Sequence, residues 1–172
     1  MKKFQDLKYQ RPNMEKLTEE IVKLQNIFDK AENSDQQFLC FQRMDTIQNY
    51  FSTMYSIANI RHSIDTRDEF YDQEINFYNE NLPLLEKLFD TFYRALLISP
   101  FRNELEKKYG RYLFDLLETK AKTFSTEIME DLVEENKLIT EYSKLIAAAE
   151  VEFQGEKYTL AQLTPLRQSK NR

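Results

Sequence analysis

The sequence predicts an all-α protein, a bundle of about six helices with a small β-hairpin at its C-terminal end. Three observations predict this fold class. The 172 residues contain only two glycines and four prolines, too few for the many tight turns of a sheet protein of this size. Apolar residues recur at spacings of three and four over long stretches, as they do on one face of a helix. The 41% hydrophobic content is sufficient for the core of one folded domain.

The first two helices are expected on either side of a polar break at 33–35. Asn13 follows Arg11-Pro12 and is expected to cap the first helix, because asparagine is a common N-cap. Ser34 is expected to cap the second helix, which runs toward His62. The apolar positions of the first helix are Leu17, Ile21, Leu24 and Phe28. They lie on one helical face, which predicts packing against a neighbour.

A third, long helix is expected after 66–69, whose sequence Thr-Arg-Asp-Glu has the form of a capping box. Alternating spacings of four and three then mark a packing seam of the bundle type. The seam consists of Tyr71, Ile75, Tyr78, Leu82, Leu85, Phe89, Phe92 and Leu96. Pro83 lies inside it, so we expect a kink where the helix loses a hydrogen bond.

The remaining helices are shorter until the last one. Ser99-Pro100 predicts a helix start with proline at the first helical position, and Gly110 is expected to end that helix after Tyr109. Another helix carries Leu113, Leu116 and Leu117. Ser125 or Thr126 is expected to cap the last long helix. Its apolar residues are Ile128, Leu132, Leu138, Tyr142, Leu145 and Ile146.

The periodicity changes near residue 149. Residues 151–158 alternate apolar and polar around Gln154-Gly155, which predicts a β-hairpin. Residues 159–162 then form a capping box for another helix. We therefore expect two parts: a helical lobe over 1–148, and a hairpin with the truncated start of a further helix over 149–172.

Charge and cysteine content narrow the classes of partner. A net charge of −5 with interspersed basic residues does not indicate a nucleic-acid partner. No stretch of about 18 apolar residues is present, so we expect no membrane partner, and the polar residues after Met1-Lys2-Lys3 do not resemble a signal peptide. A single cysteine excludes a disulfide within the chain, and a reducing, cytoplasmic location is expected.

Cofactor and catalytic motifs are missing from the sequence. One histidine and one cysteine cannot supply the three ligands of a catalytic zinc, so we expect no cofactor in this chain. Cys40 and His62 fall on one expected helix, roughly 33 Å apart, too far for a nucleophile and its base. The two isolated glycines offer no phosphate-binding loop. Paired carboxylates among the 29 acidic residues are more simply explained as solvated helix faces.

One polar cluster is dense enough to consider as a contact site. It consists of Arg61, His62, Asp65, Arg67 and Asp68, at the turn between the second and third helices. The structural interpretation is that the aspartates cap the third helix and pair with the arginines. The functional interpretation is contact with a substrate channel or another domain. We favour the structural interpretation because loop polarity is common.

The aromatic residues of the third helix also allow two interpretations. Phe70, Tyr71, Phe77, Tyr78, Phe89, Phe92 and Tyr93 could line a peptide-binding wall. At helical spacing such residues more often form a core.

Five segments, in order along the chain, resemble the N-terminal region of oligoendopeptidase F-like enzymes, which are thimet-oligopeptidase-like zinc metallopeptidases. They are Tyr9–Asn13, Ile60–Asp72, Ala95–Arg102, Glu134–Gly155 and Gln168–Arg172. The last is similar to the start of a helix that continues in relatives, where Asp is common at the position of Asn171. The resemblance covers essentially the whole chain.

The resemblance implies a mostly helical peptidase built around a deep channel that admits short peptides. In the family, zinc sits on a His-Glu-x-x-His helix in the C-terminal half, with a further Glu ligand, and activates water with the motif Glu as general base. No such motif occurs here, so no catalytic or metal-binding residue can be assigned to this chain, which alone is expected to be inactive.

Two hypotheses follow. In the first, the chain is the non-catalytic N-terminal lobe of a zinc oligopeptidase; its partners are the missing C-terminal catalytic domain and short peptides, and it forms part of the channel wall and lid. In the second, it is a self-standing helical protein-interaction module without enzymatic activity. A lobe should expose an apolar face, or hide it in a homo-oligomer, whereas a module should bury its apolar seam as a monomer. An independent enzyme using carboxylates would instead need a pocket with perturbed acids.

Overall fold

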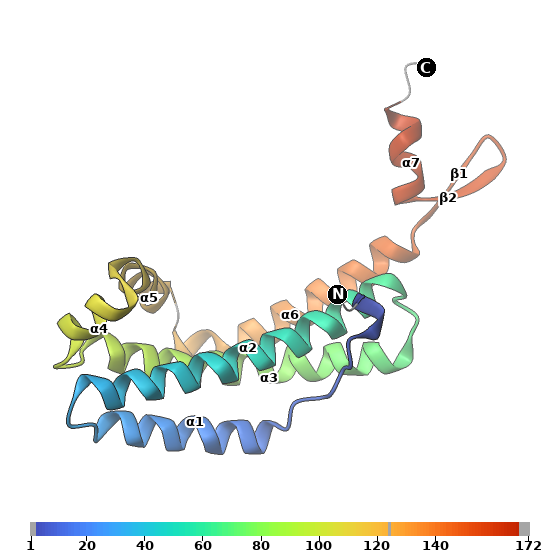
Figure 1. Cartoon of the computed structure of the whole chain (residues 1–172). Coiled ribbons are helices and arrows are strands. Elements are labelled where there is room, and N and C mark those ends of the chain that lie inside the picture. Colours follow the sequence, from blue (N-terminus) through green and yellow to red (C-terminus); the bar gives the residue numbers. More distant parts are fainter. Residues whose placement is uncertain (1–2, 124, 169–172) are drawn as a thin grey trace.

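A computed structural model describes residues 3–123 and 125–168, which form seven α-helices, two short 3₁₀ helices and one hairpin (Figure 1). The helices are α1 (Met14–Asp29), α2 (Ser34–Ile64), α3 (Glu69–Leu97), α4 (Arg102–Tyr109), α5 (Arg111–Thr123), α6 (Met129–Ala148) and α7 (Leu160–Arg167). The 3₁₀ helices are η1 (Phe4–Asp6) and η2 (Thr126–Ile128), and the strands are β1 (Glu150–Phe153) and β2 (Glu156–Thr159). The expected all-α class with a C-terminal hairpin is confirmed.

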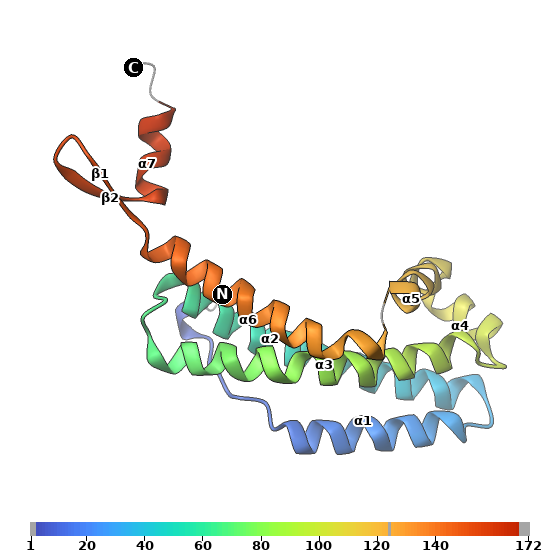
Figure 2. The same ribbon diagram turned by 180° about the vertical axis from the view of Figure 1, so that it is seen from behind.

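The long helices α1, α2, α3 and α6 lie side by side, and the shorter elements occupy the two ends (Figures 1 and 2). Helices α4 and α5 cover the end where α1 turns into α2. The hairpin and α7 project from the opposite end, beyond α6, as an arm. We call residues 150–168 the C-terminal arm. The helices give way to the hairpin at residue 150, and the expected division of the chain into two parts there stays a prediction.

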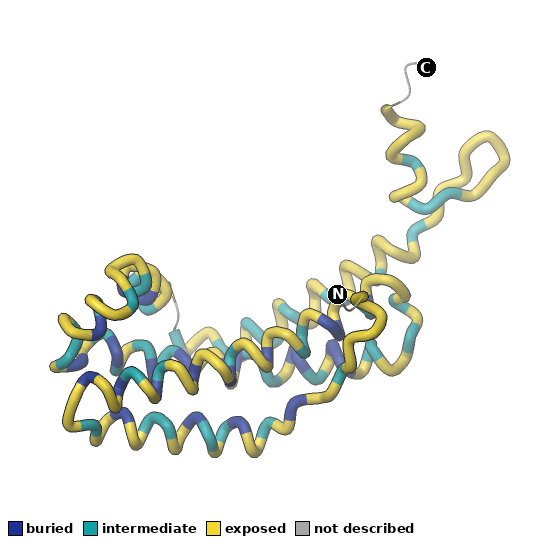
Figure 3. Tube along the Cα trace, in the orientation of Figure 1, coloured by how far each residue is buried: buried dark blue, intermediate teal, exposed yellow. Residues whose placement is uncertain are grey.

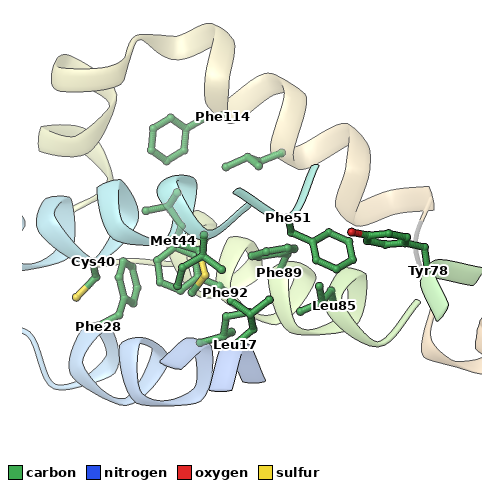
Figure 4. Packing of buried hydrophobic residues seen from close by; sticks show 14 of the residues in the cluster. Leu17, Phe28, Cys40, Met44, Phe51, Tyr78, Leu85, Phe89, Phe92 and Phe114 are labelled. Atoms are coloured by element: carbon green, nitrogen blue, oxygen red, sulfur yellow. The ribbon is translucent and has the colours of Figure 1, made fainter. Parts of the chain in front are cut away.

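The hydrophobic core is built by α1 to α5 around α3. Rings from α3 fill its centre: Tyr78 and Phe92 are fully buried, and Phe92 packs edge-to-face on Phe28 of α1 at 4.9 Å between centroids. Figure 4 shows these side chains meeting Met44 and Phe51 of α2. The core interpretation of the α3 aromatics is thus confirmed for its buried members. The burial pattern in Figure 3 places the dark core positions along α1 to α5, and only intermediate and exposed ones on α6 and the arm.

Two predicted helix starts, one predicted helix end and the predicted hairpin turn are confirmed. The Asn13 side chain accepts a hydrogen bond from the Lys16 amide at 2.9 Å, and Thr159 with Gln162 forms the expected capping box of α7. Gly110 ends α4 with φ of +82° and ψ of 150°, a conformation close to glycine-only. In the hairpin, Gln154 and Gly155 both have positive φ, as a type I′ turn requires.

Other helix starts differ from the prediction. The capping box at 66–69 is wrong: Asp68 caps α3, and its carboxylate accepts from the Phe70 and Tyr71 amides at 2.9 and 3.2 Å. Thr66 lies in the preceding turn, two residues before the cap position, too early to reach the first helical amides. Thr66 and Asp68 can both cap a helix, and the side chain that does so is the carboxylate of Asp68, which lies directly before the first helical residue.

Two further caps are corrected. Asn33, not Ser34, caps α2 by accepting from the Gln36 amide at 3.0 Å, and Ser34 is the first helical residue. Helix α4 starts at Arg102 rather than at Pro100, because Ser99 and Pro100 are used in a turn in which the Ser99 hydroxyl accepts from the Phe101 amide at 3.0 Å.

The last long helix begins later than predicted. The Ser125 hydroxyl accepts from the Glu127 amide at 3.3 Å, but it starts η2, and α6 follows from Met129. Helix α3 is continuous through Pro83, and the kink expected there stays a prediction. Residues 169–172, which include Asn171 of the resembling C-terminal segment, lie outside the described residues.

The N-terminal segment is fastened to α3 by a buried carboxylate. Glu74 is 2% exposed, and its two oxygens accept from the Arg11 guanidinium at 2.5 to 3.1 Å. The Tyr9 hydroxyl donates to the same carboxylate, and the Arg11 guanidinium lies 4.8 Å over the ring of Phe77. Desolvation alone would raise the pKa of Glu74, but the Arg11 and Tyr9 hydrogen bonds outweigh it and hold the pKa below its ordinary value of 4.5.

We predict that this contact makes the stability of the protein depend on acidic pH. Because the pKa of Glu74 is depressed in the folded state, its stabilising contribution is present above the unfolded-state pKa and is lost as pH falls through the folded-state pKa. Glu74→Gln should lower the free energy of unfolding by about 1–3 kcal/mol at pH 7 and flatten its decline between pH 5 and 3. Urea unfolding at several pH values measures both effects.

The matched substitution is Glu104→Gln, on an exposed carboxylate of α4. It removes the same charge without a buried partner and should change the free energy of unfolding at pH 7 by less than about 0.5 kcal/mol. Equal effects of the two substitutions would show that Glu74 does not fasten the N-terminal segment.

Candidate functional site

The predicted polar cluster is brought together at the turn between α2 and α3, where its arginines and aspartates make internal contacts. Arg61 donates to the Tyr71 hydroxyl at 2.5 Å and to the Leu7 carbonyl at 2.6 Å, which ties the N-terminal segment to the turn. Asp65 pairs with Arg67 at 3.2 Å on the surface, and the Arg67 amide lowers the pKa of Asp65. With Asp68 as the α3 cap, these contacts support the structural interpretation. Contact of this cluster with a channel or another domain stays a prediction.

His62 differs from the rest of the cluster because it is buried. It is 5% exposed, and its Nε2 has no hydrogen-bond partner, although Asp72 Oδ1 lies 3.4 Å away. Lys144 of α6 makes an ion pair with the same Asp72 oxygen. His62 therefore lies where α2, α3 and α6 meet rather than on an open surface.

Over its second half, from Asn136 on, helix α6 presents a polar side to the bundle and an apolar side to solvent, whereas Met129, Leu132 and Val133 at its start are apolar and half-buried. None of its 20 residues, all of them described, is buried. The half-buried positions that face the bundle include Asn136, Thr140 and Lys144, spaced four residues apart. The exposed large apolar side chains of α6 are Leu138, Ile139, Tyr142, Leu145 and Ile146, which we call the α6 face. An ordinary surface helix has the opposite arrangement.

Polar contacts hold α6 along α3. Asn79 of α3 donates to the Thr140 hydroxyl at 2.9 Å and is itself buried, at 6% exposed. The Lys144–Asp72 ion pair lies on one side of it, and Lys137 Nζ lies 3.5 Å from Glu80 on the other. We call these three contacts the α3–α6 seam. The residue numbers of these partners rise along α6 while they fall along α3, so the two helices are antiparallel.

The α6 face is large for a region with no cover. Tyr142 is 64% exposed and Leu145 is 67% exposed, and Leu138, Ile139 and Tyr142 line a shallow hollow of about 470 Å³. The C-terminal arm adds Val151, Phe153, Leu160 and Leu166, each more than a third exposed. Neither strand and no residue of α7 is buried. Exposed apolar surface of this kind marks a contact with another protein surface.

Helical spacing predicts Leu138, Tyr142, Leu145 and Ile146 on the last long helix. It predicts neither Ile139 as part of this face nor the direction in which the face points. The signal that could have shown the direction is the second stripe, Asn136, Thr140 and Lys144, which repeats at equally regular spacing. Thr140 and Lys144 of this stripe meet Asn79 and Asp72 of α3, whereas Glu80 pairs with Lys137.

The residues that the structure describes do not fit a metal site or a thiol nucleophile. They contain no group of three or more His, Cys, Asp and Glu side chains placed to hold a metal ion, so a catalytic zinc with three protein ligands does not fit them. Cys40 is 4% exposed in the core, and burial raises the pKa of its thiol. Over the same residues, no helix is long and apolar enough to cross a membrane.

Comparisons with known proteins agree with this picture. The family model for the peptidase M3 N-terminal domain matches residues 4–124. The fold is similar to that of PZ peptidase A, solved with an inhibitor, at 47% identity over 97% of this chain and a TM-score of 0.92. It is similar to two solved proteins assigned as oligoendopeptidase F. One has 43% identity over 98% of this chain and a TM-score of 0.93, and the other, from Bacillus anthracis str. Ames, has 42% identity over 94% and a TM-score of 0.88.

The chain spans about 30% of the length of each of these solved chains. No curated protein matches it. The family model ends at residue 124, whereas the likeness to solved structures covers nearly all of this chain. Helix α6 and the C-terminal arm are therefore shared with the structural neighbours.

We predict that the α6 face governs the self-association of this chain. Leu138→Glu with Leu145→Glu should lower binding of a hydrophobic dye and shift any dimer toward monomer in light scattering, because it places two charges on the apolar surface. The free energy of unfolding should change by less than about 0.5 kcal/mol, since both side chains are exposed.

The control pair is Gln73→Glu with Asn76→Glu, at exposed positions of α3. It adds the same charge and should leave dye binding and mass unchanged. A loss of more than about 1 kcal/mol in the Leu138 and Leu145 variant would mean that these residues are packed in solution.

Proposed function

The chain belongs to the peptidase M3 family, matching its N-terminal domain, and we propose that it is the non-catalytic N-terminal lobe of a zinc-dependent oligopeptidase that acts on short peptides. In this proposal the lobe forms part of the wall of the substrate channel. The partner is the C-terminal catalytic domain of a longer polypeptide, and the proposed location is the cytoplasm.

The observation that carries the proposal is the α6 face with the C-terminal arm. A helix whose apolar side points outward, beside an arm with no buried residue, lacks the cover that would bury this surface. The neighbours are about three times as long as this chain, so most of such a protein is polypeptide that this chain does not contain. A contact with that polypeptide would bury the α6 face at no cost to the α1–α5 core.

The chemistry of such an enzyme is assigned to the rest of the longer protein. In the proposal, zinc and the general base belong to the C-terminal half, because the described residues here do not fit a zinc site. In this proposal the chain contributes a rigid wall of the substrate channel and no catalytic group. The aromatic core makes a rigid body, and the α3–α6 seam fixes the direction in which the α6 face points.

A self-standing interaction module is the second candidate. The observation in its favour is that α1 to α5 enclose a core of their own, which includes Tyr78, Phe92 and Phe114 at 0% exposed. A module of this kind would use the α6 face for a separate protein. The two candidates differ in whether peptidase activity appears when the downstream polypeptide is present.

We predict that only the longer product cleaves peptides. The 172-residue chain and the product of the same reading frame extended downstream would be assayed with a quenched fluorescent peptide, with and without a zinc chelator. The proposal expects cleavage by the longer product only, abolished by the chelator. Leu138→Glu with Leu145→Glu in the longer product should lower kcat/KM about tenfold or more, because the lobe would dock poorly.

Two results would contradict the proposal. Cleavage by the 172-residue chain in the presence of chelator would favour the hypothesis of an independent enzyme that uses carboxylates. An extended product that never cleaves would favour the interaction module. The Gln73→Glu with Asn76→Glu pair again serves as the control, and should keep the activity of the unmodified longer product.

A further inference from the structure

The outward side of α6 carries acidic residues as well as the α6 face. Side chains at alternating spacings of four and three form one straight row along the helix, on the side turned away from α3. The row consists of Asp131, Glu135, Leu138, Tyr142 and Leu145, and all five are exposed. This is the spacing of a seam along which one helix packs against another. We call these residues, together with the neighbouring Glu134, the α6 ridge.

The α6 ridge is acidic at one end and apolar at the other. Its three carboxylates lie in the first two turns of α6, and its apolar part begins at Leu138. The shallow hollow on α6 spans the junction, because Asp131, Glu134 and Glu135 line it beside the apolar residues already named. A partner therefore has to match a negative patch and an apolar patch at the same time.

The carboxylates of the α6 ridge have no ion-pair partner among the described residues. The two lysines of α6 are used in the α3–α6 seam, on the other side of the helix. The helix macrodipole favours an acid in the first turn, such as Asp131, but its effect falls off within that turn. It therefore does not explain Glu134 and Glu135, which lie one turn further along.

A second copy of this chain does not suit the α6 ridge. In a parallel pair of α6 helices, the acids of one copy would face the acids of the other. In an antiparallel pair, they would face the leucines and lose hydration without gaining a counter-charge. A helix with lysine or arginine next to its apolar residues meets both requirements, because each end of the ridge then has a complementary group.

We propose that the α6 ridge docks an amphipathic helix of the downstream polypeptide, with apolar residues over Tyr142 and Leu145 and with lysine or arginine opposite Glu134 and Glu135. The solved neighbours are long enough to contain such a helix, since this chain spans about 30% of their length. That the helix belongs to the same longer protein rests on the proposed function. The preference of the ridge for a basic and apolar helix does not.

The test uses a fluorescently labelled helical peptide of leucine and lysine, with leucine at heptad spacing and lysine at the other positions. Fluorescence anisotropy measures its binding to the 172-residue chain at low and at high salt. Binding should be saturable, and high salt should weaken it several-fold, because salt screens exposed charges. A peptide with glutamate in place of every lysine should bind about tenfold more weakly or not at all. Equal binding of the two peptides would overturn the proposal.

Variants locate the binding on the ridge. Glu134→Gln with Glu135→Gln should weaken binding of the leucine–lysine peptide about three- to tenfold. The matched control is Glu15→Gln with Glu19→Gln, on exposed carboxylates of α1, and it should bind normally. Equal losses in the two pairs would reveal only a general attraction to an acidic protein, and the proposal would fail. Because both ridge glutamates are exposed, the thermal unfolding midpoint of their variant should stay close to that of the unmodified chain.

The longer product tests whether the downstream polypeptide is the occupant. Its ridge would already be covered, so it should not bind the leucine–lysine peptide. Binding as tight as that of the 172-residue chain would overturn this assignment. A dimer of the 172-residue chain that excludes the peptide would assign the ridge to a second copy and would also contradict the proposal.

These measurements involve no peptide cleavage, so their failure can be told apart from failure of the proposed function. Binding by the 172-residue chain without activity in the longer product would retain the ridge and reject the peptidase lobe. Activity in the longer product without binding by the 172-residue chain would retain the lobe and reject the ridge.

Discussion

Helix α3 has to satisfy apolar neighbours on one side and polar neighbours on another, and the rest of the structure is arranged around that requirement. Its rings enter the core between α1, α2 and α5, while Asp72, Asn79 and Glu80 meet α6. Glu74 faces the N-terminal segment and is neutralised by Arg11. A buried carboxylate or amide on a core helix is costly unless it is paired, so the buried Glu74 and Asn79 each require a partner at one place.

This requirement explains why α6 is oriented with its apolar side outward. Turning Leu138 and Leu145 toward α3 would bury the two leucines, but it would also leave Asn79 and Asp72 without their α6 partners. The unpaired polar groups would cost about 1–3 kcal/mol each, comparable to the gain from a buried leucine. The observed direction keeps every seam contact and leaves the apolar side available to another surface. The observed direction of α6 therefore agrees with the polar partners that α3 offers, at no net loss from the exposed leucines.

Most of the fold could be predicted from local chemistry, and the failures have physical reasons. Asn13, Gly110 and Thr159 act where the sequence placed them, because the competing positions beside them lack a comparable cap. At 65–69 several capping side chains stand in succession, and pattern alone could not choose Asp68 over Thr66. The number of helices and the hairpin followed from periodicity, which is a property of the chain itself.

The candidate sites were harder to predict because they depend on contacts between distant segments. The predicted cluster named His62, but not Asn79 or Thr140, which lie 17 and 78 residues further along the chain and join it only through the packing of α3 and α6. Helix α6 carries two regular stripes, one apolar and one polar, and from the sequence either of them could face the bundle. Choosing between them requires knowing which polar groups of α3 have no partner elsewhere in the bundle. The periodicity of α6 does not reveal this.

The seam and the α6 face together also imply how such a lobe would respond to a partner. The exposed ion pair between Lys137 and Glu80 contributes little in water, because surface pairs are typically worth about 0–1 kcal/mol. A surface that covers Leu138, Tyr142 and Leu145 would lie on the side of α6 turned away from the seam and would leave the seam contacts in place. Burial of the leucines would add about 1.5–3 kcal/mol each. A partner would therefore stabilise α6 by burying its apolar face, while the seam continues to fix the direction of α6 on α3.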